Sequence, residues 1–503
     1  MIRSEPHPLS VFSLVPLNER SSRALYHPKN QPHVSYLPDY WDDDHFPGEA
    51  RGINVGFNIN SKRPCTLATI GRDADIVVSG VNISRVHCSF EIAANAEIFM
   101  LRDQSINQST QFTGLDAIPL EAGRVPRQVV IHPTRNTEFG FGNANADLYQ
   151  FAILWHTPKF SVPKYLLSQG FHRHRVELDE VETPTEDQCC HSATQPLQYI
   201  MGRAVKISEF GEVCKGIDAY TGGLLAIKRV KLSNTPDRGA AGRSMEVELE
   251  NIREIHHASS PCFIESMRPN IIRILWTEMR SDNQYNIVMP LMEANVEDLI
   301  REGTLIADGK LAMLLFHQML KALDCLAARN LLHGDVQPRH ILYSRASELS
   351  SAFRLAGFGL CSYTASINKL MVDTDPYKPP EVLKGGRSSW SHKMDVWALL
   401  VTMAYALDMA GMQTLFETPG FWMSREFQEV SIQRAVSMPT FHRLQRMAML
   451  DPAERASAAD MLDLMFQGEG RTTLRRPDSG IGESSGPADL SRRQSWSSAM
   501  SVD

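Results

Sequence analysis

The sequence predicts a multidomain protein in which an all-β sandwich precedes a two-lobed α+β domain, with disordered termini. Three observations support this prediction. The chain has 503 residues, which is too long for one ordinary domain. Short β-like runs separated by Gly, Asn, Asp and Pro fill residues 51–158, where no helical period occurs. Residues 198–467 begin with strand-like runs and continue with apolar residues at helical spacing.

The individual elements follow from local patterns. Within the first domain, strands are expected at residues 75–78, 87–92, 99–101, 129–131 and 149–155, each bounded by turn-forming residues. In the second domain, the apolar spacing from Leu311 to Leu326 predicts a helix. The longest apolar run, Val396 to Leu407, is too short to cross a bilayer, so we expect a buried helix there and no membrane partner.

The composition is that of a globular protein, with 43% hydrophobic and 22% charged residues. The formal net charge is −7 and no long Lys/Arg run occurs, so we expect no nucleic-acid partner. The eight cysteines lack CxxC spacing, which indicates reduced thiols in an intracellular protein.

Three segments outside the two domains lack a periodic pattern. Residues 1–50 are rich in Pro, His, Asp and Ser, and we expect them to be disordered. Residues 159–197 form an acidic linker between the domains. Residues 468–503 contain many Ser and few large apolar residues, which predicts a disordered Ser-rich tail.

Three motifs follow one another in the first domain. Gly71-Arg72 precedes a strand, Ser84 and His87 fall in the next motif, and Asn107 lies in an Asp-x-Ser-x-Asn sequence. In this order they resemble a forkhead-associated (FHA) domain covering about residues 51–158. The resemblance implies that a phosphothreonine-containing protein is the partner, that Arg72, Ser84 and Asn107 bind it, and that His87 braces the loop from inside. Gln108-Ser109 replaces the family's Gly-Thr.

The chemistry of these residues suits a phosphate. A phosphothreonine carries nearly two negative charges and three acceptor oxygens at pH 7. Arg72 can offer a guanidinium fork and Ser84 a hydroxyl donor. Each such bond contributes about 1.5–3 kcal/mol.

Motifs across residues 198–467 resemble those of a serine/threonine protein kinase. Leu225-Ala226-Ile227-Lys228 matches the strand lysine motif, and Asp335 of His333-Gly334-Asp335 stands where the catalytic base would be. The resemblance implies a nucleotide site at Val213, Ala226, Lys228, Glu248, Pro290, Met292 and Leu342. Residues that build the kinase lobe also match, namely His333, Phe358, Gly359, Glu381, Asp395 and Arg455, the last expected to pair with Glu381.

The residues that handle metal and phosphate depart from the kinase pattern. Gly357 replaces the Asp of Asp-Phe-Gly, His340 replaces the catalytic-loop Asn and Gln337 replaces its Lys. Gly334 replaces an Arg that in regulated kinases receives an activation-loop phosphate. Metal ions supply several kcal/mol of transition-state stabilisation, and each ~1.4 kcal/mol changes the rate tenfold.

We therefore predict a pseudokinase with no metal-binding residues and a poor Mg²⁺ site, and leave open whether ATP binds without metal. The alternative is an active ATP-dependent serine/threonine kinase that uses Asp335 as its base with an atypical metal site. Imidazole is a poor ligand for Mg²⁺, which disfavours that alternative.

The order of the two domains resembles that of FHA-containing checkpoint effector kinases, which implies DNA-damage signalling in the nucleus. We predict a phosphothreonine-dependent signalling adaptor whose kinase-like domain is a scaffold. Thr183 and Thr185 lie in an acidic sequence within the linker. If phosphorylated, they would fit the FHA-like domain of a second copy, so phosphorylation-dependent self-association is also predicted.

Overall fold

The structure is a computed structural model. The residues that it describes are 2–38, 40, 50–63, 65–93, 98–115, 117–156, 196–208, 211–231, 270–280, 284–347, 350–358, 361–363, 376–383, 390–418 and 427–474. They belong to two compact units. The first comprises residues 1–208 and 212–227, and the second residues 209–211 and 228–503. The predicted order, a β-rich region followed by a region of strands and then helices, is confirmed.

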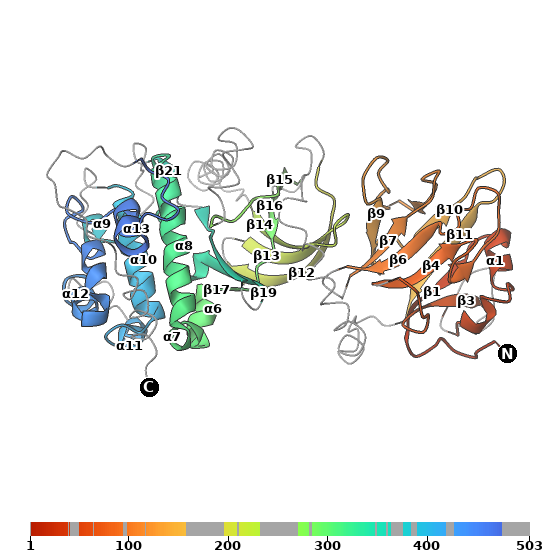
Figure 1. Ribbon diagram of the computed structural model, residues 1–503, viewed down its shortest axis with the longest axis horizontal. Coiled ribbons are helices and arrows are strands. Elements are labelled where there is room, and N and C mark those ends of the chain that lie inside the picture. The colour runs from red at the N-terminus through yellow and green to blue at the C-terminus, as the bar shows by residue number, and fades with distance from the viewer. Residues whose placement is uncertain are drawn as a thin grey trace. The chain divides into compact units, whose positions relative to one another are not determined.

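Two antiparallel-rich sheets form the sandwich of the first unit (Figure 1). One has the order β2 (Val34–Tyr36), β3 (Arg51–Gly56), β1 (Ser10–Pro16), β11 (Tyr149–Trp155), β10 (Glu138–Phe141) and β8 (Gln111–Thr113). The other has the order β5 (Ile76–Val77), β4 (Thr66–Gly71), β6 (Cys88–Ile92), β7 (Phe99–Asp103) and β9 (Gln128–Ile131). Burial alternates along β11, which explains why its sequence predicted a strand.

Aromatic side chains fill the space between the two sheets. Phe12 from β1, Phe90 from β6 and Phe139 from β10 are fully buried, and the Phe12 and Phe90 rings meet edge to face with centroids 5.0 Å apart. This core fixes the sheets, so the loops at their ends are presented by a rigid support.

The expectation that residues 1–50 are disordered is wrong for residues 2–38. Strand β1 lies in the interior of its sheet, where it pairs antiparallel with both β3 and β11. Helix α1 (Glu19–Ala24) follows, capped by the Asn18 side chain, and then the 3₁₀ turn η1 (Gln31–His33). Nearly all of β1 is buried on both faces, so it lacks the alternating pattern by which a half-exposed strand is recognised. The sandwich therefore begins well before residue 51.

The kinase-like region begins with a five-stranded sheet in the order β12 (Tyr199–Ser208), β13 (Gly211–Asp218), β14 (Leu224–Lys231), β16 (Gln284–Pro290) and β15 (Trp276–Met279). Two small sheets follow, one of β17 (Ala294–Asn295), β19 (Ile341–Ser347) and β20 (Ser350–Leu355), and one of β18 (Leu331–Leu332) and β21 (Ser362–Tyr363). The predicted acidic linker lies outside the described residues except for positions 196 and 197.

Helices make up most of the second unit, drawn from green to blue in Figure 1. They are α6 (Val296–Arg301), α7 (Thr304–Ala307), α8 (Gly309–Ala327), η4 (Pro338–His340), α9 (Pro380–Leu383), α10 (Lys393–Ala406), α11 (Met412–Glu417), the π-helical η10 (Phe427–Ser431), α12 (Ile432–Ser437), η11 (Pro439–Met447) and α13 (Ala458–Phe466). The two helices expected from apolar patterns are confirmed as α8 and α10. Helix α10 is buried on nearly all sides.

The chain after α13 folds back onto α8. The buried carboxylate of Asp324 accepts hydrogen bonds from the main-chain N–H of Thr473 at 3.0 Å and from its hydroxyl at 2.8 Å. Residues 468–474 are therefore part of the second unit, and the expectation of a disordered tail from residue 468 is wrong for them. Residues 475–503 lie outside the described part of the chain.

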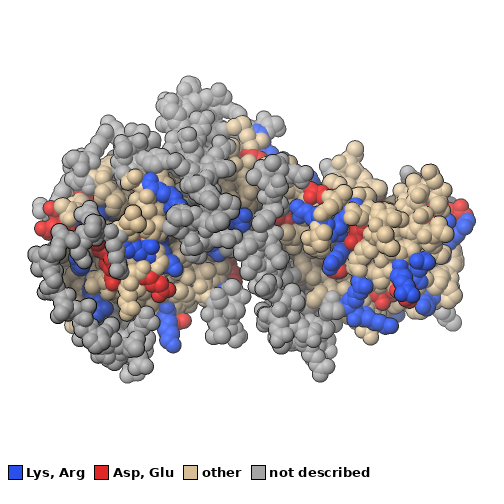
Figure 2. All heavy atoms as spheres, turned by 45° about the horizontal axis from the view of Figure 1, so that its top comes forward, with Lys and Arg blue, Asp and Glu red and all other residues tan. Residues whose placement is uncertain are grey.

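Charges of both signs are mixed on the described part of one face. Figure 2 shows Lys and Arg interspersed with Asp and Glu over the described residues of the face in view. Among the described residues, no helix is both long and apolar enough to cross a membrane.

Candidate functional sites

The structure brings together the three residues predicted to bind phosphothreonine, here called the Arg72 site (Arg72, Ser84 and Asn107). Arg72 follows β4, and its N–H donates to the Ser84 carbonyl at 3.1 Å. The Ser84 hydroxyl accepts the N–H of Ile106 at 3.3 Å, which joins the loop of Ser84 to the loop of Asn107. The Arg72 and Asn107 side chains are exposed and, within the described residues, have no protein partner. Their donors are thus available to a ligand.

Gly71 allows the close approach of these loops. A Cβ atom at Gly71 would lie 2.2 Å from the carbonyl oxygen of Arg85 and 2.9 Å from that of Ser84. Both obstacles are backbone atoms, which cannot rotate away. Packing therefore requires glycine at position 71.

His87 supports the Arg72 site from the interior, as the resemblance implied. The ring is fully buried, and its Nδ1 accepts the N–H of Ser84 at 3.2 Å. Its Nε2 then carries the proton and lies 3.0 Å from the Ser109 hydroxyl, which also accepts the N–H of Gly142. Burial lowers the pKa of His87, so the ring is neutral at pH 7.

A buried ion pair holds the loop that carries Asn107. The Asp103 carboxylate accepts the N–H of Ser105 and the hydroxyl of Thr110, both at 2.9 Å, and pairs with the Arg127 guanidinium. Arg127 also donates to the Leu120 carbonyl at 2.9 Å. Sequence reasoning did not single out Arg127, because it lies 24 residues from Asp103 and belongs to no local motif.

The predicted nucleotide-binding residues fall in both units. Val213 lies on β13 and Ala226 on β14, in the first unit. Lys228, Pro290, Met292 and Leu342 lie in the second unit, where Met292 and Leu342 pack against its core. Glu248 lies outside the described residues, as does Gly359.

Asp335, the predicted base, is held by neighbours from its own loop. Nδ1 of His340 lies 3.2 Å from Oδ2 of Asp335 and 3.0 Å from its main-chain oxygen. The Gln337 amide donates to the other carboxylate oxygen. Burial alone would raise the pKa of Asp335, but the hydrogen bond and charge of His340 lower it overall. The carboxylate is therefore ionised and occupied by protein partners.

The His340 ring packs directly against Gly357. Gly357 has a φ of +84°, and a Cβ atom there would lie 2.6 Å from Cγ and 2.8 Å from Nδ1 of the His340 ring. We call this arrangement the His340–Gly357 contact. While the His340 ring keeps its position, no side chain fits at position 357. The two departures from the kinase pattern are thus one structural feature.

Among the described residues that build the lobe, Arg455 and Asp395 make buried contacts. Arg455 donates to the two carboxylate oxygens of Glu381 at 2.7 and 2.9 Å, which confirms the predicted pair. The buried Asp395 accepts the N–H of His333 at 2.8 Å and that of Gly334 at 2.9 Å. Burial raises the pKa of Asp395 to about 7 and lowers the pKa of His333 to about 4.

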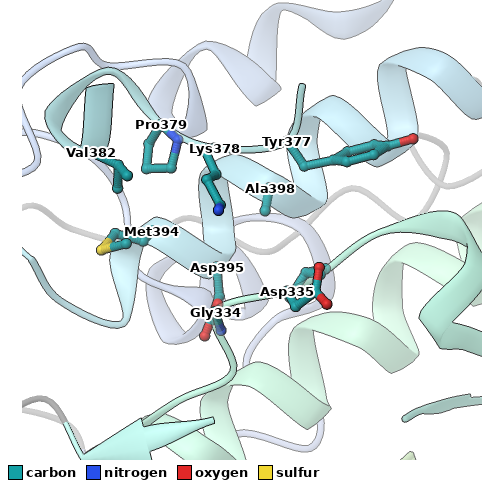
Figure 3. Close-up of a pocket in the computed structure, with 10 residues that line it drawn as sticks. Gly334, Asp335, Tyr377, Lys378, Pro379, Val382, Met394, Asp395 and Ala398 are labelled. Atoms are coloured by element: carbon teal, nitrogen blue, oxygen red, sulfur yellow. Dashed lines mark hydrogen bonds between the residues drawn. The ribbon is translucent and has the colours of Figure 1, made fainter. Parts of the chain in front are cut away.

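A pocket opens beside Asp335 where Gly334 has no side chain (Figure 3). Its lining includes residues 334–336 and 377–379 and the side chains of Met394 and Asp395. Figure 3 shows Lys378 pointing into the pocket toward Gly334 and Asp395. Lys378 therefore supplies a positive charge beside the position of the missing arginine. The sequence signal for Lys378 is its place directly before Pro379-Pro380-Glu381.

Comparison with known families agrees with this geometry. The protein kinase domain family matches residues 203–466, which is just over half of the chain, and the FHA domain family matches residues 68–124. Similar proteins include mitogen-activated protein kinase 13 of Mus musculus (24% identity, covering 54% of this chain and 74% of that protein). Serine/threonine-protein kinase KIN28 of Saccharomyces cerevisiae is 24% identical (50% and 78%). Serine/threonine-protein kinase PAK mbt of Drosophila melanogaster is 25% identical (50% and 37%).

The chain covers very different fractions of these relatives' lengths. It covers only 19% of MAP kinase kinase kinase wis4 of Schizosaccharomyces pombe. Each of these matches spans about half of this chain. From the match over residues 203–466 and the geometry above, the chain belongs to the protein kinase family and carries an FHA domain ahead of its kinase domain.

Proposed function

We propose that the protein is a phosphothreonine-dependent signalling adaptor whose kinase domain is catalytically impaired and acts as a scaffold. The His340–Gly357 contact is the observation that carries this proposal. At this contact, a glycine and an imidazole stand where a kinase has its two metal-ligand side chains, and the His340 ring fills the space that a side chain at position 357 would need.

These residues do not fit a Mg²⁺ site. Mg²⁺ prefers oxygen ligands in a near-octahedral arrangement. Gly357 offers no side-chain oxygen, and Nδ1 of His340 is already engaged by Asp335. A kinase domain generally uses ATP, but transfer of its terminal phosphate depends on metal charge stabilisation.

The Arg72 site supports the adaptor part of the proposal. FHA domains bind phosphothreonine-containing proteins, and this one keeps Arg72, Ser84 and Asn107 on loops that are hydrogen-bonded to each other. The exposed guanidinium of Arg72 provides the charge-assisted donors that a phosphate requires.

Binding of phosphothreonine peptides tests the adaptor role. We expect a phosphothreonine peptide library to bind the full chain and its unphosphorylated counterpart to fail. Arg72→Ala should weaken binding by roughly tenfold or more, since one charge-assisted bond is worth about 1.5–3 kcal/mol. Arg23→Ala is the matched control, because Arg23 is also exposed but lies on α1. Equal binding of both libraries would exclude the proposal.

Restoring the metal ligands tests the scaffold role. The double substitution Gly357→Asp with His340→Asn should create Mg²⁺-dependent ATP binding, measured by calorimetry and thermal shift. Gly357→Asp alone should instead destabilise the domain, because its Cβ would meet the His340 ring at 2.6 Å. If wild type already binds ATP in a Mg²⁺-dependent manner as well as the double variant does, the loss of ligands does not explain an impaired domain.

Two observations favour the alternative of an active kinase. Asp335 is ionised and held in place, as a catalytic base must be, and the similar proteins are serine/threonine kinases. An Asp335→Asn comparison separates the two candidates, because only an active enzyme loses phosphate transfer when its base is removed.

We also propose, from the pairing of the two domains, a role in nuclear DNA-damage signalling and self-association through phosphorylated Thr183 or Thr185. Both threonines lie outside the described residues. Light scattering of chain phosphorylated at these positions should show a dimer, and Arg72→Ala should return it to a monomer.

A tagged protein that stays outside the nucleus after DNA damage would contradict the proposed location.

A further inference from the structure

One edge of the FHA sandwich, strand β9, is contacted by a turn from the kinase domain. Strand β9 is the edge of its sheet, since only β7 pairs with it in the described sheet order. The N–H of Val130 on β9 donates to the carbonyl of Ala219 at 2.8 Å. Ala219 belongs to the turn between β13 and β14, here called the docking turn (residues 218–223), which lies in the same compact unit as the sandwich. Covering an edge strand in this way blocks its open hydrogen-bonding groups.

Tyr220 anchors the docking turn in the sandwich. Its side chain is 4% exposed and joins the hydrophobic core of the sandwich. The hydroxyl donates to the Pro119 carbonyl at 3.3 Å, and the Gln128 side chain donates to the Tyr220 carbonyl at 3.2 Å. The Arg124 guanidinium lies 4.0 Å from the ring centroid, within the range of a cation–π interaction. Packing, hydrogen bonds and a cation–π contact therefore all hold Tyr220 against the sandwich.

The docking turn is shaped for this contact. The Asp218 carboxylate accepts the N–H of Tyr220 at 2.8 Å and that of Thr221 at 2.9 Å, which fixes the direction of the Tyr220 side chain. Gly222 has a φ of +72°, and a Cβ atom there would lie 3.0 Å from Cβ of Ala93 in the sandwich. Both the backbone conformation and the close approach favour glycine at this position.

The same part of the sandwich also supports the Arg72 site. Arg127 donates to the Leu120 carbonyl and pairs with Asp103, which holds the loop of Asn107. Pro119, next to Leu120, accepts the Tyr220 hydroxyl. One segment of chain therefore contacts both the support of the Arg72 site and the docking turn.

We propose that the docking turn locks the first strands of the kinase domain to the FHA sandwich. The strands concerned, β12, β13 and the start of β14, carry Val213 and Ala226 and fold as one cooperative unit with the Arg72 site. This unit does not depend on whether the kinase domain is active or whether the Arg72 site binds phosphothreonine.

Hydrogen exchange of the full chain, read by mass spectrometry on peptides covering β9, tests the proposal without any ligand. We expect the Val130 amide to be protected in wild type and to exchange roughly tenfold faster or more in Tyr220→Ala, because the turn that accepts its hydrogen bond is released. Gly222→Ala should have the same effect through an independent change. Tyr220→Phe, which keeps the ring, should have a smaller effect.

Thr221→Ser is the matched control, because Thr221 lies in the same turn with an exposed side chain and serine retains the hydroxyl that accepts the N–H of Gly223 at 3.1 Å. In this control variant, the Val130 amide should exchange as in wild type. Unchanged exchange across β6 and β7 will show that the sandwich remains folded in each variant. If the Val130 amide exchanges equally in wild type and in Tyr220→Ala with the sandwich folded, or exchanges without protection in wild type, the docking turn is not a lock. Because no peptide or nucleotide is added, this outcome is independent of the proposed function.

Discussion

Two backbone positions determine how the Arg72 site is held. Gly71 lies against the carbonyl oxygens of Arg85 and Ser84, where no side chain fits. Gln108 has a φ of +48°, although an L-residue with a side chain is disfavoured in that region. The FHA pattern has glycine at the position of Gln108, so this chain retains the loop conformation at a cost in stability.

Gly71→Ala should weaken both folding and peptide binding. The added methyl group must displace the backbone that joins Arg72 to Ser84, which we expect to reduce the unfolding free energy of the sandwich by about 1–3 kcal/mol. Urea denaturation and a peptide titration measure the two effects. Arg72→Ala provides the contrast, since removing this exposed side chain should weaken binding by roughly tenfold or more while stability stays near that of wild type. A Gly71→Ala protein with normal stability and binding would contradict the packing argument.

Gln108→Gly should stabilise the sandwich. Glycine adopts the left-handed conformation without the steric cost of a side chain, although it also gains freedom in the unfolded chain. We expect a net increase of up to about 1 kcal/mol in unfolding free energy, seen as a higher midpoint in thermal denaturation. Gln108→Ala retains a side chain at the same φ and should give no such increase.

At the scale of elements, α10 is tied to the loop of Asp335 by a buried carboxylate. Asp395, near the start of α10, accepts the N–H groups of both His333 and Gly334. Its pKa of about 7 is above the ordinary range for Asp, because burial disfavours the charged form. The hydrogen bonds of Asp395 therefore connect the loop to the helix, and the stability of this connection depends on pH.

Replacing Asp395 with Asn isolates this pH dependence. Between about pH 4.5 and 6.5 the folded protein keeps the Asp395 proton, whereas the unfolded chain has lost it. Stability from this group is therefore present at low pH and lost as pH rises toward 7. The unfolding free energy of wild type minus that of Asp395→Asn should fall with pH by a slope approaching about 1.4 kcal/mol per unit. A difference that is constant, or that rises with pH, would show that the carboxyl group is ionised throughout.

At the scale of the whole molecule, the N-terminal segment is a structural part of the FHA unit. The Ser13 hydroxyl on β1 donates to the Asn54 side chain on β3 at 2.8 Å. Asn30, fully buried, donates to the Val77 carbonyl and accepts the Val77 N–H, both at 2.8 Å. The segment thus also pairs with the edge strand β5, which leads into the loop of Ser84.

Leu14→Ala should destabilise the sandwich by about 2–5 kcal/mol, because it leaves a cavity beneath an interior strand. Leu9→Ala is the matched control, since Leu9 is 37% exposed and should lose less than about 1 kcal/mol. Thermal denaturation followed by tryptophan fluorescence compares the two. Equal effects of the two substitutions would mean that residues before position 51 do not belong to the fold.

Local patterns were sufficient to predict much of this architecture. The alternation along β11 and the spacing in α8 identified those elements, and the motif residues Glu381 and Arg455 identified a pair that lies 74 positions apart. Features that depend on contacts between distant segments were not predictable. Strand β1 contains buried serine whose partner lies far along the chain, and so resembled a disordered segment.

The candidate sites show the same limit. The sequence identified Arg72, Ser84 and Asn107 through motif order, but the Asp103–Arg127 pair that supports them is visible only in the folded chain. It also identified Gly357 and His340 as two separate departures from the kinase pattern. Only the folded chain shows that the His340 ring fills the space that a side chain at position 357 would occupy.

Transfer of labelled phosphate from ATP to a protein acceptor, in the presence of Mg²⁺, tests the central claim most directly. If the proposed function is right, purified wild type and Asp335→Asn should transfer the same background amount, because Gly357 supplies no ligand oxygen and Nδ1 of His340 lies against Asp335. Transfer by wild type that clearly exceeds that by Asp335→Asn would show that the kinase domain is active and would contradict the account.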